Sequence, residues 1–132
     1  MTEGKHTGGC RCGAVRFEAG SQPENSTVCY CRCCQRSFGA ASVAWLTFGV
    51  ADFTWTKDKP ADYESSPGAT WRFCANCGTS LAFTNERNPN VIDIATAAMD
   101  DPEAFPPRGI VFPGQKLGWD VCLDKPIFHD EK

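Results

Sequence analysis

The sequence lacks a long hydrophobic run, an apolar leader and an excess of basic residues. No stretch approaches the ~18 consecutive apolar residues that cross a bilayer, and residues 1–5 lack the apolar core of a signal peptide. Thirteen Lys and Arg stand against 16 Asp and Glu, and the net charge of −3 gives no general attraction to a phosphate backbone. These absences argue against membrane and nucleic-acid partners, and they predict a cytoplasmic protein.

Long regular elements are also unexpected, because 12 Gly and 9 Pro punctuate a chain of only 132 residues. We predict a single domain over residues 1–132, with a mainly β fold of short strands and little helix. Apolar stretches that alternate with polar residues, or that run continuously, predict the strands. They cover residues 14–18, 40–48, 53–55, 61–64, 70–73, 80–84 and 91–97. We expect one short helix that stops at Gly39, a helical turn within residues 100–105, and an extended strap from Pro106 onward.

Histidine is scarce, whereas cysteine is abundant. The two histidines, His6 and His129, lie near the chain ends, and we interpret both as solvated side chains rather than metal ligands. The nine cysteines are an odd number, which fits a disulfide framework poorly, and a reducing compartment disfavours stable disulfides. The cysteines therefore favour metal binding.

Four of the cysteines fall inside residues 29–34, Cys-Tyr-Cys-Arg-Cys-Cys. If the chain is extended up to Cys31, then Cys29 and Cys31 share one face, and a following helical turn brings Cys34 beside Cys31. Cys33 points about 100° away from Cys34 around that turn and is not expected to join the other three as a ligand. Three thiolates with a vacant fourth position are the pattern of a catalytic zinc. The alternative, thiols packed as small apolar residues in a core, explains so tight a cluster less well.

Two further pairs, Cys10/Cys12 and Cys74/Cys77, supply the four thiolates of a closed, structural zinc centre. Its binding free energy, on the order of 10 kcal/mol, would count directly towards folding. A competing assignment gives Cys10 and Cys12 to residues 29–34 and leaves Cys74/Cys77 as a redox C-x-x-C motif. That motif needs a helix starting between its cysteines, whereas Gly78 and a predicted strand follow here. The spacing also differs from that of ferredoxins, which favours zinc over an iron–sulfur cluster.

Three ordered motifs carry a family resemblance. They are Gly9-Cys10-Arg11-Cys12-Gly13, then residues 29–34 followed by Gly39-Ala40, and then Phe73-Cys74-Ala75-Asn76-Cys77-Gly78-Thr79, with Asp93 and Asp100-Asp101-Pro102 after them. In these motifs the chain resembles the glutathione-dependent formaldehyde-activating enzymes, which share a domain with centromere protein V, over roughly residues 5–120. It departs from that family at Tyr30, usually histidine, at the added Cys33, and at residues 109–111, which replace His-Ile-Trp.

The resemblance implies a β-tent of short antiparallel strands around a structural zinc. It implies two zinc ions per chain, one on Cys10, Cys12, Cys74 and Cys77 and one on Cys29, Cys31 and Cys34. The implied activity is that of a zinc-dependent carbon–sulfur lyase of the S-(hydroxymethyl)glutathione synthase type, which joins a small thiol such as glutathione to an aldehyde such as formaldehyde at the three-cysteine site.

Other residues near the cluster are open to two interpretations. Arg32, Gln35 and Arg36 are either binding groups for the carboxylates of a glutathione-like thiol or solvated surface side chains. The tryptophans are interpreted as core or rim aromatics rather than substrate platforms. The alternative function, from a different class, is a non-catalytic zinc-binding scaffold for protein or ligand binding.

Overall fold

The computed structural model describes residues 5–120, and these are built mainly from short strands. Within that range lie ten strands, one α-helix and four 3₁₀ turns. In chain order they are β1 (His6–Gly9), β2 (Arg16–Ala19), β3 (Asn25–Cys29), α1 (Arg32–Phe38), β4 (Val43–Gly49), η1 (Val50–Asp52), β5 (Phe53–Trp55), β6 (Ala61–Ser66), β7 (Ala69–Phe73), β8 (Ser80–Asn85), β9 (Val91–Ala95), η2 (Thr96–Ala98), η3 (Pro102–Ala104), β10 (Gly109–Val111) and η4 (Pro113–Gln115). The mainly β fold with little helix is confirmed. None of the helices in this range is long and apolar enough to traverse a bilayer.

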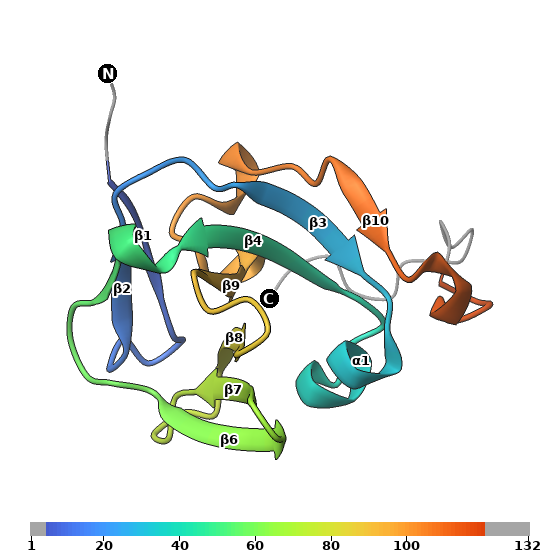
Figure 1. The fold of residues 1–132 in the computed structure, drawn as a ribbon, viewed down its shortest axis with the longest axis horizontal. Helices are drawn as coiled ribbons and strands as arrows, with labels where there is room; N and C mark the ends of the chain where they lie inside the picture. Colours follow the sequence, from blue (N-terminus) through green and yellow to red (C-terminus); the bar gives the residue numbers. More distant parts are fainter. Residues whose placement is uncertain (1–4, 121–132) are drawn as a thin grey trace, which may run out of the picture.

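The strands form two sheets (Figure 1). One has the order β1-β2-β5, and the other has the order β10-β3-β4-β9-β8-β7-β6. Paired neighbours are antiparallel, as expected, with the exception of β10 and β3, which run parallel. Parallel neighbours need a crossover connection, and β10 reaches β3 only after the chain has passed through η2 and η3.

The strap expected from Pro106 onward is more regular than predicted, because β10 is anchored to β3. The buried Ser26 hydroxyl donates to the carbonyl oxygens of Phe105 and Pro106, at 3.4 and 3.2 Å. The Arg108 amide in turn donates to the Ser26 carbonyl oxygen at 2.9 Å. These contacts hold the strap beside the strand that leads into the first cysteine of residues 29–34.

The large sheet buries a different cluster on each face. Leu46 and Phe48 of β4 belong to a core that includes Phe17 of the small sheet. Trp45, which directly precedes Leu46, points to the other face and joins a second cluster with Phe38 of α1. This second face of the large sheet carries the candidate site described below.

His6 was expected to be solvated, and this expectation is wrong. Its ring is half-buried and meets the Phe105 ring edge-on, with 5.1 Å between centroids. The ring lies on β1 and packs against Phe105, the residue that caps the end of η3, and is therefore not fully solvated. His129 lies outside the described residues.

Candidate functional site

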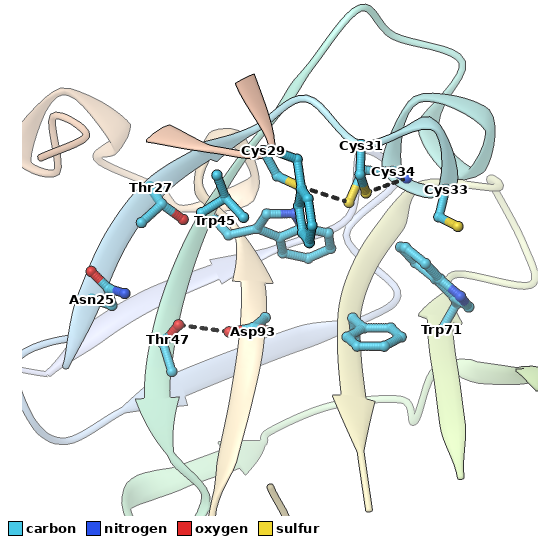
Figure 2. A pocket seen from close by; sticks show the side chains of 13 residues that line it. Asn25, Thr27, Cys29, Cys31, Cys33, Cys34, Trp45, Thr47, Trp71 and Asp93 are labelled. Atoms are coloured by element: carbon cyan, nitrogen blue, oxygen red, sulfur yellow. Dashed lines mark hydrogen bonds between the residues drawn. The ribbon is translucent and has the colours of Figure 1, made fainter. Parts of the chain in front are cut away.

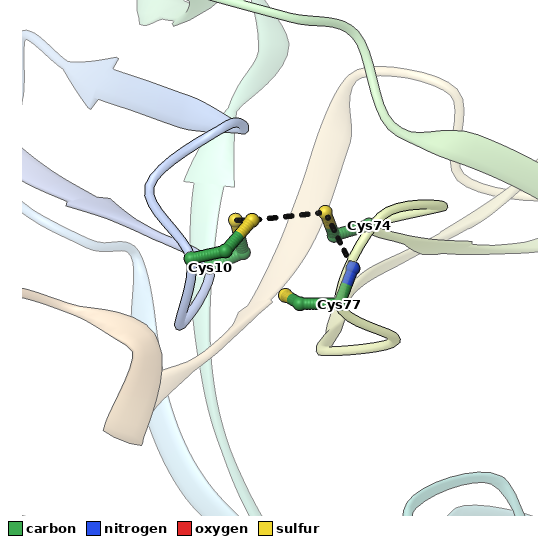
Figure 3. A group of neighbouring side chains, drawn as sticks. Cys10, Cys74 and Cys77 are labelled. Atoms are coloured by element: carbon green, nitrogen blue, oxygen red, sulfur yellow. Dashed lines mark hydrogen bonds between the residues drawn. The ribbon is translucent and has the colours of Figure 1, made fainter.

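Four cysteines from two distant turns meet at one point. Cys10 and Cys12 follow β1, and Cys74 and Cys77 follow β7 (Figure 3). All four sulfur atoms lie within 4.8 Å of one another. The Sγ–Sγ distance is 3.6 Å between Cys10 and Cys12, and 3.8 Å between Cys12 and Cys74. The structure thus brings together the two dispersed pairs and keeps them apart from residues 29–34, contrary to the competing assignment.

Backbone amides of both turns point at these sulfurs. Val15 N–H donates to Cys10 Sγ at 3.2 Å, and Cys77 N–H donates to Cys74 Sγ at 3.4 Å. Gly78 closes the second turn at φ +82°, a conformation that a side chain disfavours, and its amide donates to the Cys74 carbonyl oxygen. Such N–H groups favour the negatively charged form of a sulfur.

The donor set of this cluster fits zinc. A tetrahedron with Zn–S bonds of ~2.3 Å has edges of ~3.8 Å, close to the sulfur separations observed here. The hydrogen bond with the Thr79 hydroxyl, with further help from backbone amides, lowers the pKa of Cys77 to about 5. A thiol with so low a pKa is available as a thiolate ligand at neutral pH.

The second cluster is built where β3 passes into α1. Cys29 ends the strand, Cys31 caps the helix by accepting a hydrogen bond from Cys34 N–H at 3.3 Å, and Cys34 lies in the first turn. The three sulfurs lie within 4.8 Å of one another, with 3.6 Å between those of Cys29 and Cys34. Cys33 is exposed and is not part of the cluster, as the helical period predicts. Gly39, at φ +62°, ends α1 as expected.

This cluster also fits a cation. Burial raises the pKa of the Cys34 thiol, so a thiolate at this position is disfavoured without a compensating positive charge. Three sulfur donors within 4.8 Å of one another, two of them at 3.6 Å, suit zinc, and they leave one position of a tetrahedron for another ligand.

The three-cysteine cluster forms one end of a cavity of about 350 Å³ (Figure 2). Trp45, Trp71 and Phe83 supply its aromatic walls. Ring centroids are 6.1 Å apart between the two tryptophans and 4.6 Å apart between Trp71 and Phe83. Trp45 is therefore both a buried core residue and a cavity wall, a double role that its position in the sequence did not indicate.

The three polar residues proposed to bind the thiol lie outside this cavity. Gln35 is buried, and its amide nitrogen donates to the Tyr30 carbonyl oxygen at 2.8 Å. Its side-chain oxygen accepts from Arg32 Nη1 at 2.6 Å. Arg36 lines a neighbouring hollow that shares Trp71 with the cavity. Tyr30, one of the three departures from the family pattern, lies under Lys116, whose Nζ is 5.4 Å from the ring centroid.

Gln35 should stabilise the loop that holds the second cluster. Gln35→Leu removes the donor to the carbonyl oxygens of Tyr30 and Gln115, and leaving them unpaired should lower the free energy of unfolding by about 1–3 kcal/mol. Urea unfolding measures the loss, and Arg36→Gln, at an exposed position of the same helix, is the control. Equal stability of the two variants would contradict this role.

Comparisons with known proteins find relatives that match most of the chain. The sequence model of a family described as glutathione-dependent formaldehyde-activating enzyme matches residues 5–115. A Halomonas elongata protein, which its name assigns provisionally to these enzymes, is 30% identical over 112 residues, or 78% of this chain and 71% of the relative. An uncharacterized lyase of Schizosaccharomyces pombe is 30% identical over 99 residues, or 67% of this chain and 66% of the relative.

A solved structure supports the fold. The crystal structure of a Rhodobacter sphaeroides protein superposes with a TM-score of 0.63 and 21% sequence identity, covering 80% of this chain and 99% of the other. The family match spans most of the chain, including both cysteine clusters, and a relative of 30% identity covers more than two thirds of it. The chain therefore belongs to the glutathione-dependent formaldehyde-activating enzyme family.

Proposed function

We propose that this protein joins a small thiol of the glutathione type to a small aldehyde such as formaldehyde, or catalyses the reverse cleavage. The observation that carries the proposal is a cluster of three cysteines, Cys29, Cys31 and Cys34, opening into an aromatic cavity. The cavity volume lies within the usual range for small-molecule sites, about 300–1,000 Å³. The family match and the names of the two relatives point to the same chemistry.

Two zinc ions belong to this proposal. Cys10, Cys12, Cys74 and Cys77 would hold one as a closed, structural centre, and Cys29, Cys31 and Cys34 would hold the other with a position left open. Bound there, zinc would supply the positive charge that keeps a substrate thiol deprotonated.

The proposed reaction forms one carbon–sulfur bond. The thiol gives its proton to solvent, its sulfur attacks the carbonyl carbon, and the carbonyl electron pair moves onto oxygen, which takes a proton back from solvent. Trp45, Trp71 and Phe83 form the walls beside the cysteine end of the cavity. Their part is to exclude water and to hold the thiol and the aldehyde next to each other.

Deprotonating the thiol explains little of the acceleration. Lowering a thiol pKa from ~8.5 to ~6 raises the thiolate fraction at pH 7 from about 3% to about 90%, roughly thirtyfold. With a Brønsted slope of ~0.45, the same change lowers nucleophilicity about thirteenfold, which leaves a net gain of about twofold. Orientation in the cavity, with effective molarities of up to ~10⁵ M or more in favourable cases, must supply most of the rest.

The proposal is tested with the purified, zinc-loaded full chain. We expect two zinc ions per chain, binding of glutathione by calorimetry, and faster formation of the formaldehyde adduct than in buffer with free zinc. One tightly held zinc, with Cys29, Cys31 and Cys34 all reactive towards a thiol probe, would contradict the open site. Protein that neither binds glutathione nor accelerates adduct formation would contradict the activity.

A non-catalytic scaffold is the second candidate, and one surface feature favours it. Ile110 and Phe112, in and directly after β10, are exposed large apolar side chains, and Phe112 also lines the cavity. An exposed apolar surface continuous with a cavity is typical of a binding site. Failure of the activity test together with intact metal binding would favour this function.

A further inference from the structure

The cavity has a second polar end that the proposed reaction does not use. Asn25 of β3 is paired with Thr47 of β4, and Thr47 is paired with Asp93 of β9, so the three residues form one row across the sheet. All three line the cavity, and Figure 2 shows them at the end opposite Cys31 and Cys34. The sequence resemblance included Asp93 but gave it no role.

Asp93 is a carboxyl group with few partners. Its Oδ1 accepts a hydrogen bond from the Thr47 hydroxyl at 2.6 Å. No Lys or Arg lines the cavity, and within residues 5–120 no basic side chain forms an ion pair with Asp93. Burial raises the pKa of the Asp93 carboxyl, and the bond from Thr47 offsets only part of that effect. A cationic group in the cavity would compensate the buried carboxylate.

The distance to the cysteine end limits what Asp93 can do. Asn25, in the Asp93 row, lies four residues before Cys29 on β3. Four residues of strand span roughly 13 Å at ~3.3 Å per residue. The row that contains Thr27 and Trp45 lies between the two ends. Asp93 is thus too far away for proton transfer at the cysteine cluster, and its place in the cavity is that of a binding residue.

We propose that Asp93, positioned by Thr47, binds a positively charged amino group that the thiol substrate carries on the order of 10 Å from its sulfur. This inference rests on the proposed function and adds to it a residue that distinguishes thiols with a distant amino group from thiols without one. The amino group of a γ-glutamyl residue next to a cysteine meets this requirement. Free cysteine and 2-mercaptoethanol are too short to occupy both ends of the cavity.

Binding of a thiol-blocked peptide tests the inference without requiring turnover. S-methylglutathione and an analogue with glutaryl in place of γ-glutamyl, which lacks only the amino group, are compared by calorimetry on the zinc-loaded protein. The wild type should prefer S-methylglutathione by about thirtyfold or more, as expected for losing one partner of a buried charge pair. Asp93→Asn, of the same shape, should bind both peptides equally and as weakly as the wild type binds the glutaryl peptide.

Further variants separate a binding role from a structural one. Thr47→Val removes the bond to Asp93 and should lose part of the preference, whereas Glu103→Gln, at an exposed position away from the cavity, should retain all of it. In turnover assays, Asp93→Asn should raise KM for glutathione with little change in kcat. The inference is overturned if the wild type binds neither peptide, or if Asp93→Asn keeps the preference for the amino group.

The inference and the proposed function can fail separately. If the protein prefers the amino group through Asp93 but forms no adduct, the binding site is supported and the enzyme activity is contradicted. If the protein forms adducts equally well with glutathione and with the glutaryl thiol, the activity is supported and the role of Asp93 is contradicted.

Discussion

Replacing Cys74 by serine should unfold the protein. Cys74 is 1% exposed, and its sulfur lies 3.8 Å from that of Cys12, so the substitution removes one ligand of the proposed zinc centre between the turn after β1 and the turn after β7. The binding free energy of a structural zinc is on the order of 10 kcal/mol. Net stability is only about 5–15 kcal/mol. Loss of the metal would therefore remove most of the stability of the fold.

Thermal unfolding followed by circular dichroism, together with metal analysis, measures this effect. The control is Cys33→Ser, which makes the same change at an exposed cysteine outside both clusters and should melt like the wild type. A chelator added to the wild type should reproduce the Cys74→Ser result. A Tm of Cys74→Ser within about 4 °C of the wild type, equivalent to ~1 kcal/mol, would contradict a structural centre at this position.

The sequence predicted the parts of the fold that depend on local pattern. The strand expected over residues 53–55 is β5, and the alternating stretch from Val91 is β9 followed by η2. The short helix and its glycine stop follow from the spacing of the second cysteine cluster and from the left-handed conformation of Gly39. Each of these features is encoded within a few neighbouring residues, which is the range that periodicity and turn chemistry can report.

The strands that sequence reasoning missed depend on distant partners. β1 contains Gly8-Gly9, which disfavour a strand, yet a Cβ atom at Gly8 would lie 2.5 Å from the Ala98 carbonyl oxygen and from Phe17 Cζ. Glycine is needed there because other parts of the chain approach closely. β10 likewise has β3, a strand far earlier in the chain, as its only sheet neighbour among the described residues. No local pattern contains that information.

The candidate site was likewise predictable from the sequence only in part. The three-cysteine cluster and the two separate pairs follow from short-range spacing, whereas the meeting of Cys10 and Cys12 with Cys74 and Cys77 joins distant parts of the chain and left a competing assignment open. The aromatic walls and Asp93 depend on register across four strands, in which Thr47 pairs with Asp93, Asp93 with Phe83, and Phe83 with Trp71. Such pairs are far apart in the chain. The cavity, and hence the second polar end, was therefore beyond prediction from one sequence.

Cys34→Ser should abolish adduct formation while the protein remains folded. The serine hydroxyl stays protonated at neutral pH and does not replace a thiolate, so the second metal should be lost and the first retained. Without a fixed anchor for the substrate sulfur, the rate should fall about a hundredfold or more, the loss expected when a reacting group is misplaced by about 1 Å. The initial rate of adduct formation and the zinc content per chain, both relative to wild type, are the measurements.

Cys33→Ser distinguishes loss of the cluster from loss of any thiol near the cavity. The two positions are adjacent, but only the Cys34 sulfur lies beside that of Cys29, at 3.6 Å, whereas Cys33 is exposed. Cys33→Ser should therefore keep two zinc ions and the wild-type rate. An equal loss of rate in both variants would mean that the chemistry depends on thiols in general rather than on the three-cysteine cluster. Full activity in a Cys34→Ser protein that holds only one zinc would contradict a role for the cluster in the reaction. The aromatic cavity alone would then have to account for the acceleration.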